Sequence, residues 1–284
     1  MSENPQVAPG EFLMSSEEAD RYREDGFFVR RSVFDPSEVS VLRQAVEQVV
    51  HEQAQRTAGE TYTIDGNRYR DGSEVTLQYE HHAGARTIRV IEPFHHLHPD
   101  LDRLVDDPRM TEPMCGILGC DRVALWTDKI NFKRPREGSG FRWHQDSPYW
   151  SHVCDETGRL PNVMVALDDA SEENGCFRVI RGSHQNGFLP GIDDATQLGP
   201  LFTDPGCFDE ADQFAAVVPA GSQVFFSPHA VHGSQPNGSS RQRRALVLTY
   251  QPGGRRMFKI DATRNAGGQR SRIDAFANSA RSSS

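Results

Sequence analysis

Short apolar runs separated by turns fill the chain from Val123 to Tyr250 and limit the folds open to it. Runs rich in Val, Ile and Phe and bounded by Gly, Pro, Asn and Asp are typical of β-strands. We expect strands at residues 123–132, 141–146, 162–167, 177–180 and 243–250, and two strands around a tight turn at 216–226. Residues 185–215, rich in Gly, Pro and Asp, are expected to form a loop. This pattern of about eight short strands predicts a jelly-roll barrel.

Helix signals dominate the first part of the chain. Ser15 before an acidic turn and Gly26 after it predict a short helix between them. The sequence Asp35-Pro36-Ser37-Glu38 joins an N-cap, a Pro at the first helical position and a Glu that reaches back to the cap, so a helix is expected to about residue 55. Its apolar residues should form a buried stripe: Val39, Val41, Leu42, Val46, Val49 and Val50. Helical sequence follows at 94–118, with short strands at 27–29 and 86–91, whereas residues 56–85 show no clear pattern.

These signals predict a mainly β protein whose N-terminal helices pack against one sheet of the barrel. We expect a single domain over residues 15–262, with a helical part to about residue 120 and a β core over about 122–252. Residues 1–14 and 263–284 are polar and rich in small residues, so both are expected to be flexible.

Charge and composition limit the possible partners. The chain has 31 Lys and Arg against 40 Asp and Glu, a formal net charge of −9, which opposes binding to nucleic acid or an anionic membrane. No apolar run approaches the roughly 20 residues of a membrane-spanning helix, and the N-terminus lacks the layout of a signal peptide. The five Cys lack C-x-x-C spacing, so reduced thiols and a cytoplasmic location are expected.

His144 and Asp146 form an H-x-D sequence within the expected strand at 141–146. Residues i and i+2 of a strand project to the same face, so this strand could present two metal ligands together. Two imidazoles and one carboxylate are the ligands of mononuclear Fe(II) oxygenases. His229 and His232 are candidates for the distant third ligand, and we choose His232. H-x-D alone also fits a polar surface strand, and His95, His96 and His98 fit a loop that enters a helix better than a metal site.

Arg243 and Ser234 could hold a co-substrate. An Fe(II) oxygenase needs a second electron source, usually 2-oxoglutarate, whose carboxylate far from the metal must be bound. A buried guanidinium does so with two parallel hydrogen bonds, and a hydroxyl adds another. Arg243 taken alone also fits the solvated basic end of a strand.

Several motifs together resemble the phytanoyl-CoA dioxygenase family of Fe(II)/2-oxoglutarate oxygenases. The similarity runs in order from about Ser16 to Pro252. It is carried by Trp143-His144-Gln145-Asp146, Ala166-Leu167-Asp168-Asp169-Ala170, Glu173-Asn174-Gly175-Cys176, Arg181-Gly182-Ser183-His184 and His232-Gly233-Ser234-Gln235-Pro236-Asn237 with Arg243.

The resemblance implies a double-stranded β-helix, a cupin-like jelly roll, that uses Fe(II), 2-oxoglutarate and O₂. It places His144, Asp146 and His232 on iron, and Arg243 on the far carboxylate with Ser234 helping. By the same comparison Lys129 and Arg89 are further co-substrate contacts, and His184 is structural. Met164 stands where the family often has an aromatic residue, so the pocket is expected to differ there.

The expected reaction is hydroxylation of an unactivated C–H bond of an apolar small molecule, with release of succinate and CO₂. Asp146 favours hydroxylation, because related halogenases lack the carboxylate ligand. Aromatic residues at 141, 143, 149 and 150 suggest an apolar substrate, and a lipid, an acyl thioester or a secondary metabolite all fit. The alternatives are desaturation, cyclisation or epimerisation with the same cofactors, and a cupin-like metal isomerase or a binding module without 2-oxoglutarate.

Overall fold

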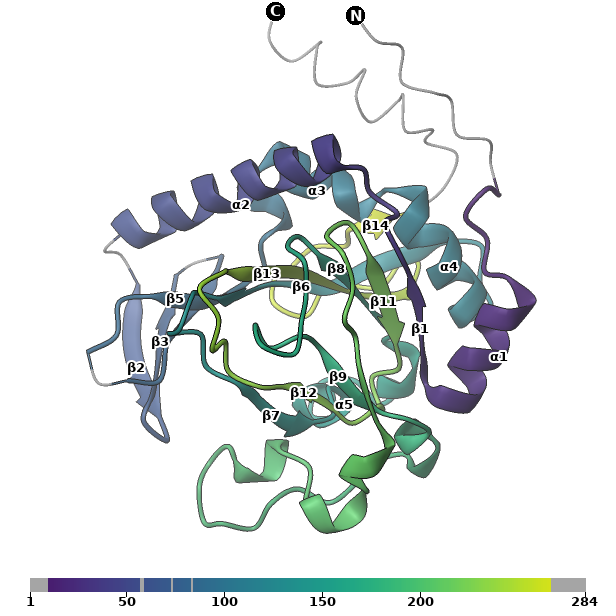
Figure 1. The fold of residues 1–284 in the computed structure, drawn as a ribbon. Coiled ribbons are helices and arrows are strands. Elements are labelled where there is room, and N and C mark those ends of the chain that lie inside the picture. The colour runs from purple at the N-terminus through teal and green to yellow at the C-terminus, as the bar shows by residue number, and fades with distance from the viewer. Residues whose placement is uncertain (1–9, 57–58, 73, 83, 267–284) are drawn as a thin grey trace, which may run out of the picture.

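Two β-sheets form the body of the protein. We analysed a computed structural model, which describes residues 10–56, 59–72, 74–82 and 84–266. The larger sheet has ten strands in the order β1-β11-β8-β13-β6-β5-β4-β3-β2, with β14 paired to β6, and the smaller has the order β10-β9-β12-β7. Figure 1 shows the small sheet facing the strands β8, β13 and β6 of the large sheet. The pairing is antiparallel throughout.

The strands have the following bounds: β1 Phe27–Arg30, β2 Glu60–Ile64, β3 Asn67–Asp71, β4 Thr76–Tyr79, β5 Ile88–Glu92, β6 Val123–Lys133, β7 Phe141–His144, β8 Asn162–Ala166, β9 Arg178–Ile180, β10 Gln213–Ala215, β11 Gln223–Phe226, β12 His232–Ser234, β13 Arg243–Pro252 and β14 Asn265–Ala266. The α-helices are α1 Ser16–Asp25, α2 Pro36–Gln55, α3 Pro99–Val105, α4 Pro108–Leu118 and α5 Ser147–Trp150. Single 3₁₀ turns lie at His95–Leu97, Thr157–Arg159, Ser183–Asn186, Gly199–Leu201, Pro205–Cys207 and Glu210–Asp212.

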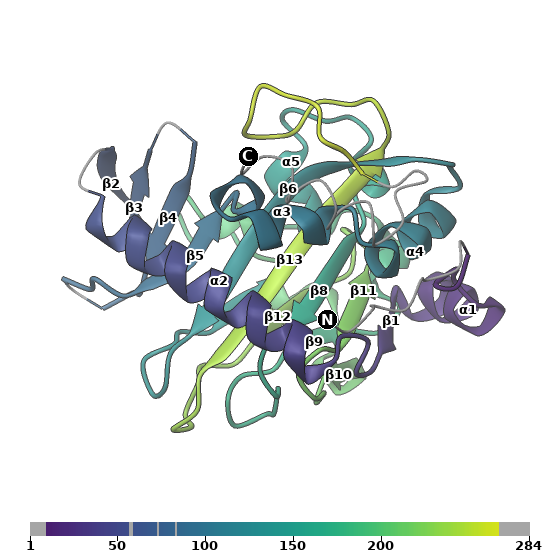
Figure 2. The same cartoon turned by 90° about the horizontal axis from the view of Figure 1, so that it is seen from above.

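The N-terminal helices cover the outer face of the large sheet. Figure 2 shows α2 crossing this face, with α3 and α4 beside it. Val46 of α2 and Met110 of α4 are fully buried and belong to the same apolar cluster as Leu246 and Leu248 of β13. Full burial of such a side chain contributes about 1.5–3 kcal/mol to folding, so this layer anchors the strands that carry the site. No helix among the described residues has the length and apolar character needed to cross a membrane.

The expected α1 and α2 are confirmed together with their caps. Ser15 and Asp35 each form a capping box with the Glu three residues later. Val41, which was expected in the buried stripe of α2, is instead 46 % exposed. At 3.6 residues per turn Val41 lies about 200° from Val39, on the opposite side of the helix.

Other segments differ from the expectation. The helical stretch at 94–118 is a 3₁₀ turn followed by α3 and α4, because Pro99 and Pro108 each begin a new helix. Of residues 216–226 only β11 is a strand, and Val218 makes an isolated bridge to Ala170. The expected loop at 185–215 ends in the strand β10. Residues 1–9 and 267–284, most of the expected flexible ends, lie outside the described residues.

Residues 60–79, which showed no sequence pattern, form β2, β3 and β4. These strands continue the large sheet beyond β5 as antiparallel neighbours. Figure 1 shows that they extend to one side of the barrel, beyond the edge of the small sheet.

Candidate metal centre and cavity

His144 and His232 are brought together by strand register. His144 is the last residue of β7, His232 is the first of β12, and the two residues are direct partners in the antiparallel pair. Their ring centroids are 4.1 Å apart. Asp146 lies just beyond β7 in a helical conformation, with φ −76° and ψ −30°. The expectation that both ligands stand on one strand is therefore wrong: the chain turns after His144, and this turn aims the carboxylate at the imidazoles.

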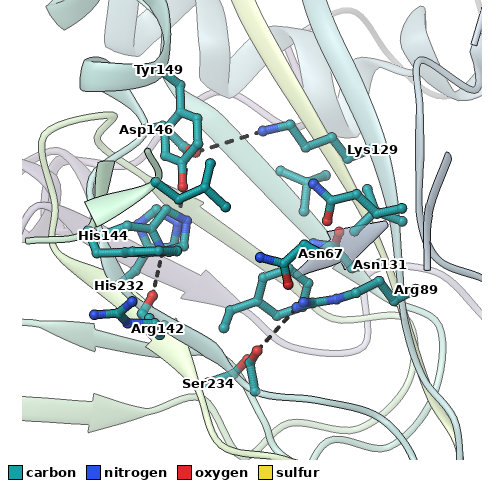
Figure 3. A pocket seen from close by; sticks show the side chains of 18 of the residues that line it. Asn67, Arg89, Lys129, Asn131, Arg142, His144, Asp146, Tyr149, His232 and Ser234 are labelled. Carbon is teal, nitrogen blue, oxygen red and sulfur yellow. Dashed lines mark hydrogen bonds and ion pairs between the residues drawn. The ribbon is translucent and has the colours of Figure 1, made fainter. Parts of the chain in front are cut away.

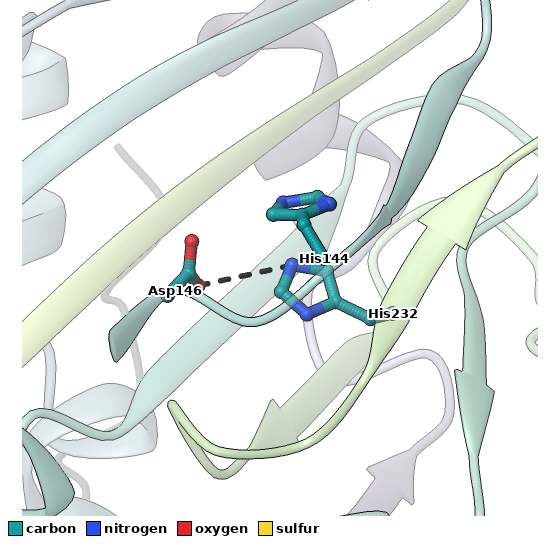
Figure 4. A group of neighbouring side chains, drawn as sticks. All are labelled: His144, Asp146 and His232. Atoms are coloured by element: carbon teal, nitrogen blue, oxygen red, sulfur yellow. Dashed lines mark ion pairs between the residues drawn. The ribbon is translucent and has the colours of Figure 1, made fainter. Parts of the chain in front are cut away.

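The three side chains form a compact donor group. One ligand atom from each lies within 4.8 Å of the others, and Figure 4 shows the carboxylate directed at the two rings. Nδ1 of His144 lies 2.7 Å from the carbonyl of Arg142, and Nδ1 of His232 lies 3.0 Å from the carbonyl of Ala230. A carbonyl can only accept, so Nδ1 carries the proton and Nε2 keeps a free lone pair. This is the only group of its kind among the described residues.

The electrostatics suit a metal ligand set. Burial, with His232 nearby, lowers the pKa of His144 to about 3, and burial also lowers the pKa of His232. Burial alone would raise the pKa of Asp146, but His232, Lys129 and His144 together hold it below its ordinary value. Asn162 adds a hydrogen bond of 2.9 Å to Oδ2 of Asp146. At neutral pH the group therefore presents two neutral imidazoles and a carboxylate, the donor set suited to Fe(II).

The other histidines have different partners. Nδ1 of His229 lies 2.8 Å from the hydroxyl of Ser147, away from the donor group. Nδ1 of His95 pairs with Asp128 at 2.7 Å, and His98 caps α3. His184 lies 3.1 Å from the carbonyl of Arg23, which ties a 3₁₀ turn to α1. The structural roles expected for His184 and for the cluster around His95 agree with these contacts.

The donor group opens into a cavity of about 470 Å³ between the two sheets. Figure 3 shows the side chains around this cavity, with the imidazoles on one side and Lys129, Asn131 and Arg89 on the other. All four residues expected to bind a co-substrate line the cavity: Arg243, Ser234, Lys129 and Arg89. Binding of a co-substrate by them remains a prediction.

Arg243 is buried at the start of β13, with 4 % exposure. Its Nη2 donates to the carbonyl of Gly175 at 2.6 Å, and its Nε has no partner among the described residues. Burial lowers the pKa of Arg243 to about 10, only partly opposed by Cys176 and Asp168. A buried guanidinium without a carboxylate partner is well prepared for an anionic ligand.

Ser234 and Lys129 face the cavity from different strands. Ser234 lies two residues after His232 on β12, so both side chains project to the same face. Nζ of Lys129, on β6, lies 3.9 Å from Oδ1 of Asp146. Burial would lower the pKa of Lys129, but Glu92 and Asp146 raise it above the ordinary value. Lys129 therefore stays charged beside the candidate ligand set.

The aromatic residues divide between the cavity and the interior. Phe141 and Tyr149 line the cavity, whereas Trp150 is 1 % exposed and packs against Trp126 in a separate cluster. Trp143 packs edge-on against Phe208, with ring centroids 5.7 Å apart. Sequence reasoning missed the polar side chains that also line the cavity: Asn67, Tyr69, Gln78, His81, Glu92, Asn131 and Arg142. Several of them come from β3 and β4, where no pattern signalled a strand.

Comparisons with known proteins agree with this architecture. The family model "Phytanoyl-CoA dioxygenase (PhyH)" matches residues 22–245. L-proline trans-4-hydroxylase of Streptomyces griseoviridis is 28 % identical over 248 residues, covering 81 % of this chain and 84 % of that protein. Ectoine dioxygenase of Bordetella parapertussis is 28 % identical over 257 residues, covering 84 % of this chain and 75 % of that protein.

Solved structures show the same fold. EctD from S. alaskensis with 2-oxoglutarate and 5-hydroxyectoine superposes with a TM-score of 0.66 at 24 % identity, covering 89 % of this chain and 81 % of that one. The carbocyclase SnoK from nogalamycin biosynthesis gives a TM-score of 0.58 at 23 % identity, covering 84 % of each chain. The expected mainly β, jelly-roll architecture with N-terminal helices is thereby confirmed. Since the family model spans most of the sequence, the chain belongs to the phytanoyl-CoA dioxygenase family.

Proposed function

We propose that the protein is a non-haem Fe(II)- and 2-oxoglutarate-dependent oxygenase that hydroxylates an unactivated C–H bond of a small molecule. The observation that carries the proposal is the group of His144, Asp146 and His232 at the edge of a cavity between the two sheets. Family membership and relatives named as hydroxylases and dioxygenases support it. Bound Fe(II), with 2-oxoglutarate and O₂, supplies the oxidising chemistry and leaves succinate and CO₂ as co-products.

The protein's own residues bind the metal and the co-substrate and orient them. Nε2 of each imidazole and a carboxylate oxygen of Asp146 would hold Fe(II), and three protein ligands would leave room for the co-substrate and O₂. The carbonyls of Arg142 and Ala230 fix the two rings, and Asn162 fixes the carboxylate. These outer contacts keep the donor atoms in place before the metal binds.

Arg243 and Ser234 hold the far carboxylate of 2-oxoglutarate in this proposal. Arg243 supports the assignment because it is buried, lines the cavity and has a donor left over. Lys129 stands beside Asp146 and is assigned to the metal end of the co-substrate.

The primary substrate is a small molecule. The sequence led us to expect an apolar substrate, and a lipid, an acyl thioester or a secondary metabolite as its class. The polar side chains of the cavity instead favour a small polar metabolite. Hydroxylation is preferred over cyclisation or epimerisation because L-proline trans-4-hydroxylase, at 28 % identity, is named for it. We also propose a cytoplasmic location, since all five cysteines are free thiols.

The direct test compares the activity of variants at two proposed metal ligands with that of a variant at a neighbouring histidine. With Fe(II) and 2-oxoglutarate supplied, His232→Ala and Asp146→Ala should abolish 2-oxoglutarate-dependent oxygen uptake and succinate formation. His229→Ala removes an imidazole outside the donor group and should retain both. Circular dichroism checks that each variant is folded. Loss of turnover in His229→Ala with turnover kept in His232→Ala would move the third ligand and overturn the assignment.

A further inference from the structure

Arg89 reaches the cavity through an irregularity of β5. Val90 pairs with Gln78 and Ile88 pairs with Tyr79, which are adjacent on β4, so Arg89 is the extra residue of a β-bulge. A β-bulge changes the direction in which a side chain projects from its strand. Arg89 is 3 % exposed, lines the cavity and places its guanidinium carbon 4.1 Å from the centre of the Phe141 ring. Figure 3 shows the guanidinium directed into the middle of the cavity.

The contacts of Arg89 leave its charge without a direct counter-ion. Nη2 donates to the carbonyl of Gly140 at 3.1 Å, Nη1 contacts the His81 imidazole, and Nε has no partner among the described residues. Burial, followed by Arg89 itself, lowers the pKa of His81 to about 4, so this partner is neutral at pH 7. Glu80 is the carboxylate that acts on Arg89. Its Oε2 is hydrogen-bonded to Ser139, its Oε1 has no hydrogen-bond partner, and no ion pair within 4.0 Å joins it to Arg89 among the described residues. A buried guanidinium with neutral partners is stabilised by an anionic ligand.

Unpartnered amides lie on the same wall. Tyr69, Gln78, Val90 and Asn131 are consecutive cross-strand partners on β3, β4, β5 and β6, and all four line the cavity. Asn67 lies two residues before Tyr69 and faces the same way. The carboxamides of Asn67, Gln78 and Asn131 make no hydrogen bond to another described residue, so their donors and acceptors remain available to a ligand.

The guanidinium groups of Arg89 and Arg243 lie in the same region of the cavity. Cζ of Arg89 and Nζ of Lys133 lie 4.1 Å and 5.4 Å from the centre of the Phe141 ring. Arg243 donates to the carbonyl of Gly175, which lies against the Lys133 side chain, so the two guanidinium groups lie around the same end of the barrel. 2-Oxoglutarate has a single carboxylate away from the metal, and one guanidinium is enough to hold it in a bidentate pair. With Arg243 assigned to that carboxylate, Arg89 is left for a second anion.

We propose that Arg89 and the carboxamides of Asn67, Gln78 and Asn131 bind the oxyanion group, a carboxylate or a phosphonate, of a small polar primary substrate. This inference rests on the proposed oxygenase function and names the substrate class of the same site. It replaces the expected co-substrate role of Arg89 with a role in substrate recognition.

The test uses the full chain loaded with Zn(II), which does not react with oxygen, and saturated with 2-oxoglutarate. Acetate and methylphosphonate are the anionic probes, and acetamide and dimethyl methylphosphonate are their neutral counterparts, with binding followed by ligand-observed NMR. Arg89→Gln should weaken binding of at least one anionic probe by about tenfold or more, because a charge-assisted pair is lost. Arg89→Lys should retain part of the affinity.

Two controls make the result specific. Arg86→Gln removes an exposed arginine just before β5 that does not line the cavity, and it should leave probe binding unchanged. Affinity for 2-oxoglutarate, measured by calorimetry, should change less than about threefold in Arg89→Gln, since Arg243 remains. Binding of one anionic probe but not the other identifies the oxyanion and supports the proposal.

Three outcomes would overturn the inference. In the first, the neutral probes bind as tightly as the anions. In the second, Arg89→Gln leaves anion binding intact. In the third, Arg89→Gln loses affinity for 2-oxoglutarate, which would assign Arg89 to the co-substrate. Failure of the proposed function looks different: the wild-type protein would then bind no 2-oxoglutarate in the presence of metal.

Discussion

Lys133 lies in an environment that disfavours the charged form of its amine. It is fully buried at the end of β6, and its Nζ donates to the carbonyls of Ser139, at 2.8 Å, and Gln235. Burial, followed by repulsion from Arg243 and Arg89, lowers the pKa of Lys133 to about 6. The amine is thus neutral in the folded protein at neutral pH and charged in the unfolded chain.

This difference predicts a pH-dependent stability. Between the folded pKa, about 6, and the ordinary value, 10.5, the unfolded chain binds one more proton at this residue. Stability from this residue should therefore rise with pH by up to about 1.4 kcal/mol per unit above pH 6 and level off below it. Lys133→Met lacks this pH dependence. The unfolding free energy of the wild type minus that of the variant should therefore become more positive from pH 6.5 to pH 8.5 in urea titrations, as the cost of burying Lys133 falls. A constant difference would show that Lys133 is charged when folded.

Single residues also show what sequence can and cannot determine. His144, Asp146 and His232 could be named from type and spacing, and the structure brings them within 4.8 Å. Their geometry could not be predicted: the turn that aims Asp146 follows β7, and His232 reaches His144 through the pairing of β12 with β7, which no local pattern specifies. The unusual environment of Lys133 could not be foreseen, because it arises from burial in the fold and from arginines on two other strands.

The start of helix α2 is determined by hydrogen bonds among residues close to one another in the sequence. Oδ1 of Asp35 accepts from the amides of Ser37, at 2.7 Å, and Glu38, at 3.0 Å. Oε2 of Glu38 accepts from the amide of Asp35 at 2.9 Å. These contacts satisfy amides that the first helical turn leaves unpaired.

Asp35→Ala should therefore lower the unfolding free energy by about 1 kcal/mol, the usual contribution of such a cap. Chemical denaturation measures the change. Ser40→Ala, an exposed position on the same helix without a capping contact, is the matched control and should be near neutral. Equal destabilisation by both substitutions would mean that the cap does not hold the helix start.

Strands β2, β3 and β4 show the opposite case. Sequence reasoning left residues 56–85 unassigned because the side chains of β2 and β3 are mostly polar and at least partly exposed. Only the short β4 alternates, with Leu77 and Tyr79 buried. Their strand character comes from pairing with β5, which is already fixed in the large sheet. The wall of amides that faces the cavity was missed for the same reason.

At the scale of the whole molecule, the site is built where the two sheets meet. The small sheet supplies His144, His232 and Ser234 from β7 and β12, and the large sheet supplies Lys129 and Arg243 from β6 and β13. The formal net charge is −9, whereas the cavity has a small excess of positive charge. It is lined by four basic residues, Arg89, Lys129, Arg142 and Arg243, and by three acidic ones, Asp65, Glu92 and Asp146. A dianionic co-substrate is thus attracted by local charge against the overall field.

An anaerobic titration of 2-oxoglutarate into the Fe(II)-loaded protein tests the central claim most directly. A keto acid that chelates Fe(II) gives a weak visible charge-transfer band, which should appear and saturate in the wild type. In Arg243→Met the band should need at least about tenfold more 2-oxoglutarate to reach half of its full intensity. The hydrogen-bonded pair between guanidinium and carboxylate is lost there, while the metal ligands remain. Arg241→Met, an exposed arginine two residues earlier, should match the wild type. No band with iron demonstrably bound, or an unchanged titration in Arg243→Met, would contradict the assignment.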